Sequence, residues 1–122
     1  MKRGEIWTVA GGPYYTGKPR PAVILAVILN DDRFDRTNSI TVCPFTSNPA
    51  EAPLFRLPVE PSEVNGLRKP CRLMVDKITT VPKSKVGSRV GRLAAEDIVR
   101  LNRAAVVFLG IASPATERGR AR

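Results

Sequence analysis

Proline and glycine interrupt this chain so often that a fold built from long helices is excluded. The 122 residues include 11 Pro and 9 Gly, and both residue types break helices and favour turns and strand ends. The length suits one domain with one compact core. Short strands joined by turns are therefore predicted to make up most of the fold.

Runs of β-branched and apolar residues mark the expected strands, at residues 4–9, 21–29, 39–45, 54–59, 71–79 and 86–93. The run PAVILAVIL at residues 21–29 is apolar at every position rather than at alternate ones. This pattern predicts a central strand that is buried on both faces. The run is also much shorter than the ~20 residues that a membrane helix requires.

One helix is expected, at residues 95–109. Its apolar residues recur at helical spacing, acidic residues stand in its first turn, and Gly110 follows its last turn. Residues 113–122 are polar without an apolar face, and a disordered basic tail is predicted there. The predicted organisation is therefore a folded domain at residues 1–112 followed by this tail. The N-terminus MKRGEIW lacks the apolar core of a signal peptide, so a cytoplasmic protein is expected.

The basic charge of the chain is concentrated in one stretch. Lys and Arg number 20 against 11 Asp and Glu, a net charge of +9. Residues 1–67 are neutral, with seven basic and seven acidic residues, whereas residues 68–92 contain eight basic residues and one acid, Asp76. Such an excess predicts a polyanionic partner, with nucleic acid ahead of an acidic protein segment. The alternative is a solvated basic face that serves solubility.

The lack of histidine excludes several kinds of site. With no His in the chain, neither a Ser-His-Asp triad nor a Cys-His pair can form, and a zinc site of the Cys/His type is ruled out. Cys43 and Cys71 are too few for a disulfide framework, and two buried free thiols are expected. No metal or other cofactor is predicted.

Five short motifs occur in order along the chain: GEIW at residues 4–7, PRPAVIL at 19–25, VCPFTS at 42–47, GL at 66–67 and VDKI at 75–78. Their order and spacing resemble the MazF/PemK family of toxin endoribonucleases, over roughly residues 3–111. The resemblance implies a small SH3-like β-barrel with a C-terminal helix. It also implies a homodimer that cleaves single-stranded RNA at short sequences without metal, and that a cognate acidic antitoxin silences.

The resemblance assigns catalytic roles to Arg20 and Thr46. Since RNA supplies its own nucleophile, the 2′-hydroxyl, a ribonuclease mainly orients that group and stabilises the charge on phosphate. The planar guanidinium of Arg20 suits a phosphate, and the Thr46 hydroxyl adds a hydrogen bond. On its own, Arg20 could be a surface residue before a strand, and Thr46 a helix or turn cap.

Further residues are candidates for binding RNA. Tyr14 and Tyr15 could stack on splayed bases, although they could also be ordinary turn tyrosines. The basic stretch and the neighbouring loops supply phosphate contacts. The full set of candidates is Tyr14, Tyr15, Lys18, Ser47, Arg68, Lys69, Arg72, Asp76 and Lys77.

The general base is not identified by the sequence. Some members of the family carry a carboxylate before the Arg-Pro pair, whereas residues 8–20 contain no Asp or Glu. Asp76 or a water molecule could take that role. Alternatively Asp76 pairs with an arginine, as an isolated carboxylate among cations commonly does.

Two readings without catalysis stay open. One is a toxin like the gyrase poisons, which resemble the same barrel and act through an aromatic C-terminal end, although the end of this chain contains no Trp. The other is a single-stranded nucleic-acid-binding module in which Arg20 only binds phosphate. Turnover of RNA separates both readings from a ribonuclease.

Overall fold

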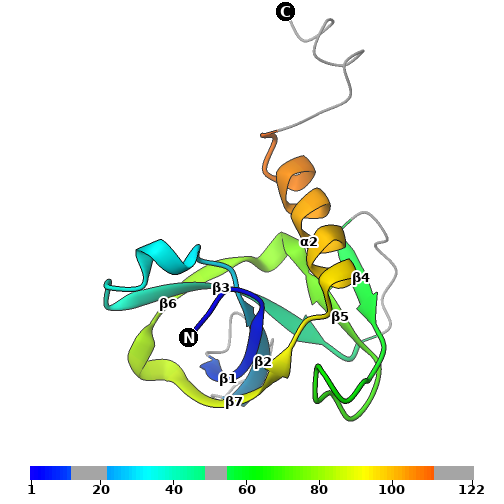
Figure 1. Cartoon of the computed structure of the whole chain (residues 1–122), viewed down its shortest axis with the longest axis horizontal. Coiled ribbons are helices and arrows are strands. Elements are labelled where there is room, and N and C mark those ends of the chain that lie inside the picture. Colours follow the sequence, from blue (N-terminus) through cyan, green and yellow to red (C-terminus); the bar gives the residue numbers. More distant parts are fainter. Residues whose placement is uncertain (12–21, 49–54, 112–122) are drawn as a thin grey trace, which may run out of the picture.

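The computed structural model describes residues 1–11, 22–48 and 55–111. In this part of the chain the fold is mainly β with one C-terminal helix, as the sequence predicts. The strands are β1 (Glu5–Gly11), β2 (Ala22–Ile28), β3 (Ser39–Thr46), β4 (Arg56–Val59), β5 (Cys71–Met74), β6 (Thr79–Pro82) and β7 (Val86–Arg92). They form one antiparallel sheet in the order β4-β5-β3-β2-β1-β7, with β6 also paired to β3. Figure 1 shows this sheet coiled into a barrel-like shape.

Strand β2 is central. Both of its faces are buried at residues 26–28, as predicted, whereas Val23 near its beginning is 71% exposed, contrary to the prediction. It pairs with β1 on one side and β3 on the other. Val27 packs in the core cluster under the helix, whereas its neighbours Ala26 and Ile28 pack in a second cluster on the opposite face of the sheet. The consecutive apolar residues Ala26, Val27 and Ile28 are what two packed faces require.

Residues 71–79 do not form the single strand that the sequence predicts. They form β5, the 3-10 turn η2 (Val75–Lys77) and β6. Along β3, Val42 pairs with Thr79 and Phe45 pairs with Leu73, so β3 advances three residues while the facing chain advances six. The three additional residues make up η2, which takes Asp76 and Lys77 out of the ladder.

Pro44 explains where this interruption occurs. Thr41 turns its backbone toward β2, because its N–H donates to Asn30 (2.6 Å) and its carbonyl accepts from Leu29 N–H (2.9 Å). Backbone groups alternate in direction along a strand, so Pro44 turns its nitrogen toward β5 and β6. A proline has no N–H to donate there, and the ladder opens opposite it.

Helix α2 (Ala95–Phe108) follows β7 and packs against β4 and η2, as Figure 1 shows. Arg100 donates to the carbonyl of Pro58 in β4 (2.9 Å) and also pairs with Asp97 (2.8 Å). The helix ends at Phe108, and Gly110 follows with a φ of +74°. In this conformation the N–H of Gly110 donates to the carbonyl of Val107, and the N–H of Ile111 donates to the carbonyl of Val106. Among residues 1–11, 22–48 and 55–111 there is no helix long and apolar enough to cross a membrane. The predicted tail at residues 113–122 lies outside the described residues.

Candidate nucleic-acid interface

Thr46 ends β3 and closes a tight turn. Its half-buried side chain accepts a hydrogen bond from the backbone N–H of Asn48 through Oγ1 (3.1 Å), and Ser47 between them is exposed. The turn-cap interpretation of Thr46 is therefore confirmed. The hydroxyl proton is not used in that bond, so Thr46 can still donate it to a ligand oxygen.

Arg72 lies directly opposite Thr46 across the β3–β5 pair. Partners in an antiparallel ladder point to the same face, with Cβ atoms about 4.5–5.5 Å apart. Arg72 is half-buried and in turn pairs with Pro58 of β4. A hydroxyl and a guanidinium therefore share one face at the end of the sheet where β3 finishes.

Three further cations of the basic stretch are exposed near this end or on η2. Arg68 and Lys69 lie in the segment that leads into β5, and Lys77 lies on η2. The sheet thus brings Thr46 and Arg72 together and leaves these cations accessible to solvent. Exposed Lys and Arg side chains with this density favour binding of a polyanion.

Asp76 forms a bidentate ion pair, but its partner is not in the basic stretch. Arg56 of β4 donates through Nε to Oδ1 (2.8 Å) and through Nη2 to Oδ2 (2.9 Å). The side chains are 16% and 21% exposed. The hydrogen bonds from Arg56 hold the pKa of Asp76 below its ordinary value. The ion-pair interpretation of Asp76 is confirmed, and a carboxylate engaged in this way is a weak proton acceptor.

Arg56 is a residue that the sequence interpretation missed. It lies in the neutral part of the chain, outside residues 68–92. The signal that could have found it was Asp76 itself, since a lone half-buried carboxylate needs a cation. The choice of Arg56 depends on the register of β4 against β5, which pairs Arg56 with Met74.

Four predicted site residues lie outside the described residues: Tyr14, Tyr15, Lys18 and Arg20. The chain resumes at Ala22, the first residue of β2. Because β2 and β3 are antiparallel, the beginning of β2 and Thr46 at the end of β3 lie at the same end of the sheet.

The two thiols are buried and unpaired, as predicted. Burial raises the pKa of Cys43 to about 12 and also raises the pKa of Cys71, whose Sγ donates to the carbonyl of Lys69 (3.4 Å). Neither sulfur has the thiolate character that nucleophilic chemistry needs. Within residues 1–11, 22–48 and 55–111, no three His, Cys, Asp or Glu side chains are grouped so that they could hold a metal.

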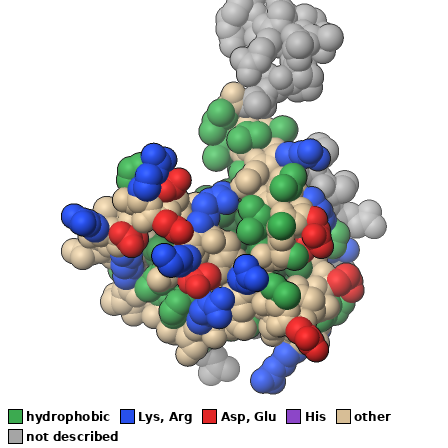
Figure 2. All heavy atoms as spheres, viewed as in Figure 1, with side chains coloured by type: hydrophobic (Ala, Val, Ile, Leu, Met, Phe, Trp, Pro, Cys, Tyr) green, Lys and Arg blue, Asp and Glu red, His purple; other side chains and the backbone are tan. Residues whose placement is uncertain are grey.

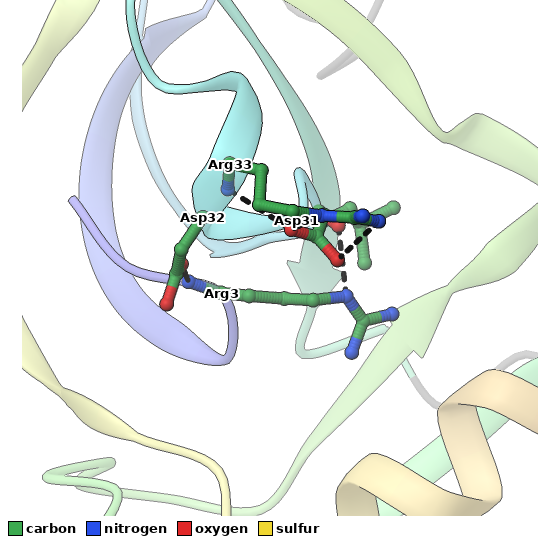
Figure 3. A network of polar contacts seen from close by, with 5 residues as sticks. Arg3, Asp31, Asp32 and Arg33 are labelled. Atoms are coloured by element: carbon green, nitrogen blue, oxygen red, sulfur yellow. Dashed lines mark hydrogen bonds and ion pairs between the residues drawn. The ribbon is translucent and has the colours of Figure 1, made fainter.

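A second polar network lies at the other end of β2, around the 3-10 turn η1 (Asp32–Phe34). Figure 3 shows Arg33 paired with Asp31 (3.0 Å) and the backbone N–H of Arg3 donating to Asp32 (2.8 Å). Arg33 is 78% exposed. On the face drawn in Figure 2, basic and acidic side chains are interspersed, and hydrophobic side chains gather along α2. The surface around η1 therefore has basic and acidic side chains in balance rather than an excess of basic ones.

Comparison with known proteins gives matches over nearly the whole chain. Residues 2–109 match the family described as "PemK-like, MazF-like toxin of type II toxin-antitoxin system". The chain is 54% identical over 112 residues to "Probable endoribonuclease MazF" of Mycolicibacterium smegmatis, an alignment that covers 92% of this chain and 99% of that protein.

Two solved structures have the same fold. One is Mycobacterium tuberculosis toxin MazF-mt6, with a TM-score of 0.71 at 21% identity, covering 87% of this chain and 96% of that chain. The other is a mycobacterial endoribonuclease in complex with its cognate antitoxin, with a TM-score of 0.74 at 19% identity, covering 93% of this chain and 99% of that chain. At these identities the two structures bear on the fold alone.

Proposed function

The chain belongs to the PemK-like, MazF-like toxins of type II toxin-antitoxin systems, and on this premise we propose that it is an endoribonuclease toxin that cleaves single-stranded RNA at short sequences without a metal ion. The observation on which the proposal rests is the cross-strand pair of Thr46 and Arg72. It puts a hydroxyl donor and a guanidinium on one face, at the end of the sheet where β2 begins two residues after Arg20.

The reaction needs no nucleophile from the protein. The 2′-oxygen of the RNA attacks the adjacent phosphorus, the bond from phosphorus to the 5′-oxygen breaks, and the products are a 2′,3′-cyclic phosphate and a 5′-hydroxyl. Arg20 binds the phosphate oxygens and stabilises the charge that gathers there, while Thr46 donates a hydrogen bond to the same group. The 2′-hydroxyl loses one proton and the leaving oxygen gains one.

The pairing of Asp76 with Arg56 argues against Asp76 as the acceptor of the 2′-hydroxyl proton, which leaves water as the other candidate. Both carboxylate oxygens of Asp76 already accept hydrogen bonds from Arg56, which lower its pKa. A carboxylate whose pKa is lowered in this way is a poorer proton acceptor than a free one.

Binding and selection of the RNA are assigned to the residues around this face. Tyr14 and Tyr15 stack on bases, and the cations contact phosphates together with Ser47: Lys18, Arg68, Lys69, Arg72 and Lys77. The exposure of Ser47, Arg68, Lys69 and Lys77 supports these roles. The base sequence that is cut then depends on the stacking residues rather than on the phosphate contacts.

We further propose that the toxin is a homodimer in the cytoplasm and that an acidic cognate antitoxin neutralises it. The same basic surface that attracts RNA suits an acidic segment that folds on binding. The antitoxin and RNA then compete for one site. A native gel with both ligands should contain binary complexes, and a stable ternary complex would overturn the competition.

Cleavage in excess chelator tests the activity. Wild type should cut a long single-stranded RNA to discrete 5′-hydroxyl ends, and Arg20→Ala and Thr46→Ala should lose that activity. Matched controls are Arg33→Ala, at the opposite end of β2, and Thr41→Ala, whose hydroxyl bonds to Thr80 (2.7 Å) near the start of β3. Both controls should cut RNA as wild type does. Intact RNA that is nevertheless bound by wild type would instead support a non-catalytic binding module or toxin.

A further inference from the structure

The pair of Arg56 and Asp76 has a geometry that leaves one edge of the guanidinium available. Asp76 accepts from Nε and Nη2, which is the side edge of the group. An arginine has five N–H donors, so Nη1 and the second hydrogen of Nη2 still point away from the carboxylate. Within the described residues, Arg56 has no third hydrogen-bond acceptor. The outer edge retains the fork that matches two phosphate oxygens.

The register of the strands puts Arg56 on the face that carries Thr46 and Arg72. Arg56 pairs with Met74, Pro58 pairs with Arg72, and Arg72 pairs with Thr46. Arg72 and Met74 are two residues apart on β5 and therefore point to the same side. Arg56 is the diagonal neighbour of Arg72, at about 7–8 Å between backbone positions. Successive phosphates along a single strand can be contacted over such a separation by two long side chains.

Asp76 fixes this arginine in place. Both side chains are mostly buried, at 16% and 21% exposure, so the guanidinium is held in one orientation rather than sampling solvent. Asp76 reaches Arg56 because η2 takes it out of the β3 ladder. A half-buried guanidinium with a fixed orientation loses less entropy on binding a phosphate than a free surface lysine does.

We infer that Arg56 is a further phosphate-binding residue for the RNA and that Asp76 is the positioning residue that aims it. This inference rests on the proposed function, since it assumes that single-stranded RNA lies across the face of Thr46 and Arg72. It adds to that surface a cation from an edge strand outside the basic stretch. It also gives the single acid of residues 68–92 a role that does not require proton transfer.

Binding of an uncleavable RNA tests the inference. The probe is a mixed-sequence single-stranded RNA with 2′-O-methyl groups, and its Kd is measured over a range of salt concentrations. Arg56→Gln should weaken binding about tenfold and reduce the slope of log Kd against log salt by about 0.7. Arg56→Lys should keep the slope while losing part of the affinity. Asp76→Asn should also keep the slope, with a loss of a few fold because the guanidinium is no longer fixed.

Arg33→Gln is the matched control, since Arg33 is also paired with a carboxylate but lies at the opposite end of β2. It should leave both Kd and slope unchanged. Thermal unfolding identifies any variant that fails to fold, and Arg56→Lys, which can still pair with Asp76, keeps the inference testable in that case. A folded Arg56→Gln variant with the Kd and slope of wild type would overturn it.

Kinetics on a cleavable RNA separate positioning from proton transfer. Arg56→Gln and Asp76→Asn should both raise KM, and Asp76→Asn should leave the shape of the pH profile of kcat unchanged. If Asp76→Asn instead abolishes kcat with no change in KM, Asp76 is the base and the inference is overturned. Failure of the proposed function has a different signature, because wild type itself would then leave the RNA uncut.

Discussion

Thr46 and Arg72 are direct cross-strand partners, one at the last position of β3 and the other at the second position of β5. The pairing joins a residue of the turn after β3 to the basic stretch that begins at Arg68. It thereby links the two parts of the sequence on which RNA cleavage and RNA binding are proposed to depend. The hydroxyl of Thr46 has two tasks at this junction, which substitutions can separate.

Substitution of Thr46 should separate its role in the turn from its role in catalysis. Thr46→Val removes the acceptor for Asn48 N–H and should cost about 1 kcal/mol of unfolding free energy. It should also reduce RNA cleavage by about 10²-fold or more, because a donor to the phosphate is lost. Thr46→Ser should restore both properties. Urea unfolding and initial cleavage rates give the two readouts, and a Thr46→Val variant as active as wild type would contradict the proposed role.

The sequence predicts the strands and helix well because local pattern determines them. The apolar run of β2 and the helical spacing before Gly110 both lie where expected. The break between β5 and β6 was not predicted, because it depends on Pro44 in a neighbouring strand rather than on residues 71–79 themselves.

The candidate site likewise contains residues that the sequence alone identifies and one that it does not. Thr46 and the exposed cations could be named from motif and charge, since each is visible in the linear sequence. Arg56 could not be, because its pairing with Asp76 depends on the registers of β4 with β5 and on the position of η2. Asp76 indicates that some cation is needed, but only the observed registers select Arg56.

Neutralising Arg68 or Lys69 should weaken RNA binding through charge alone. Both side chains are exposed in the segment before β5, so each releases counterions on binding. Arg68→Gln and Lys69→Gln should each reduce the salt slope of RNA binding by about 0.7, with the same effect on every RNA sequence. Filter binding at several salt concentrations measures this. Arg103→Gln on the exposed surface of α2 is the control, and an equal change in that variant would show that the effect is not local.

The two thiols should resist alkylation in the folded protein. Burial raises the pKa of both Cys43 and Cys71, so little thiolate is available at mildly alkaline pH. Iodoacetamide should label neither residue in the native protein and both in urea, as mass spectrometry would show. Cys71→Ser should keep RNA cleavage within about twofold of wild type, because no step uses the sulfur. Rapid labelling of native Cys71 accompanied by loss of cleavage would contradict this expectation.

Gly66 is expected to tolerate no side chain. Its φ is +69°, and a Cβ atom there would lie against the backbone carbonyl of Val90 in β7. Gly66→Ala should lower the free energy of unfolding by about 2–4 kcal/mol, since strain and a backbone clash add together. Gly110 has a similar φ of +74° but nothing within 4 Å of the added Cβ, so Gly110→Ala should cost only about 1 kcal/mol. Equal losses in urea unfolding would show that the contact with Val90 contributes nothing.

The pair of Arg56 and Asp76 should make stability depend on pH in the acid range. The hydrogen bonds from Arg56 lower the pKa of Asp76 in the folded protein below its ordinary value of 3.8. The unfolded chain therefore takes up the proton first as the pH falls. The stabilisation is fully present above the unfolded pKa and is lost as the pH falls through the folded pKa.

Asp76→Asn tests this dependence directly. It should lower the free energy of unfolding by about 1–2 kcal/mol at neutral pH, because the guanidinium of Arg56 loses its half-buried partner. The difference from wild type should shrink toward zero as urea unfolding is repeated down to about pH 2. Asp31→Asn, which breaks the exposed pair with Arg33, should differ little from wild type throughout. A deficit in Asp76→Asn that stays constant down to the lowest pH would mean that the charge of Asp76 does not stabilise the fold.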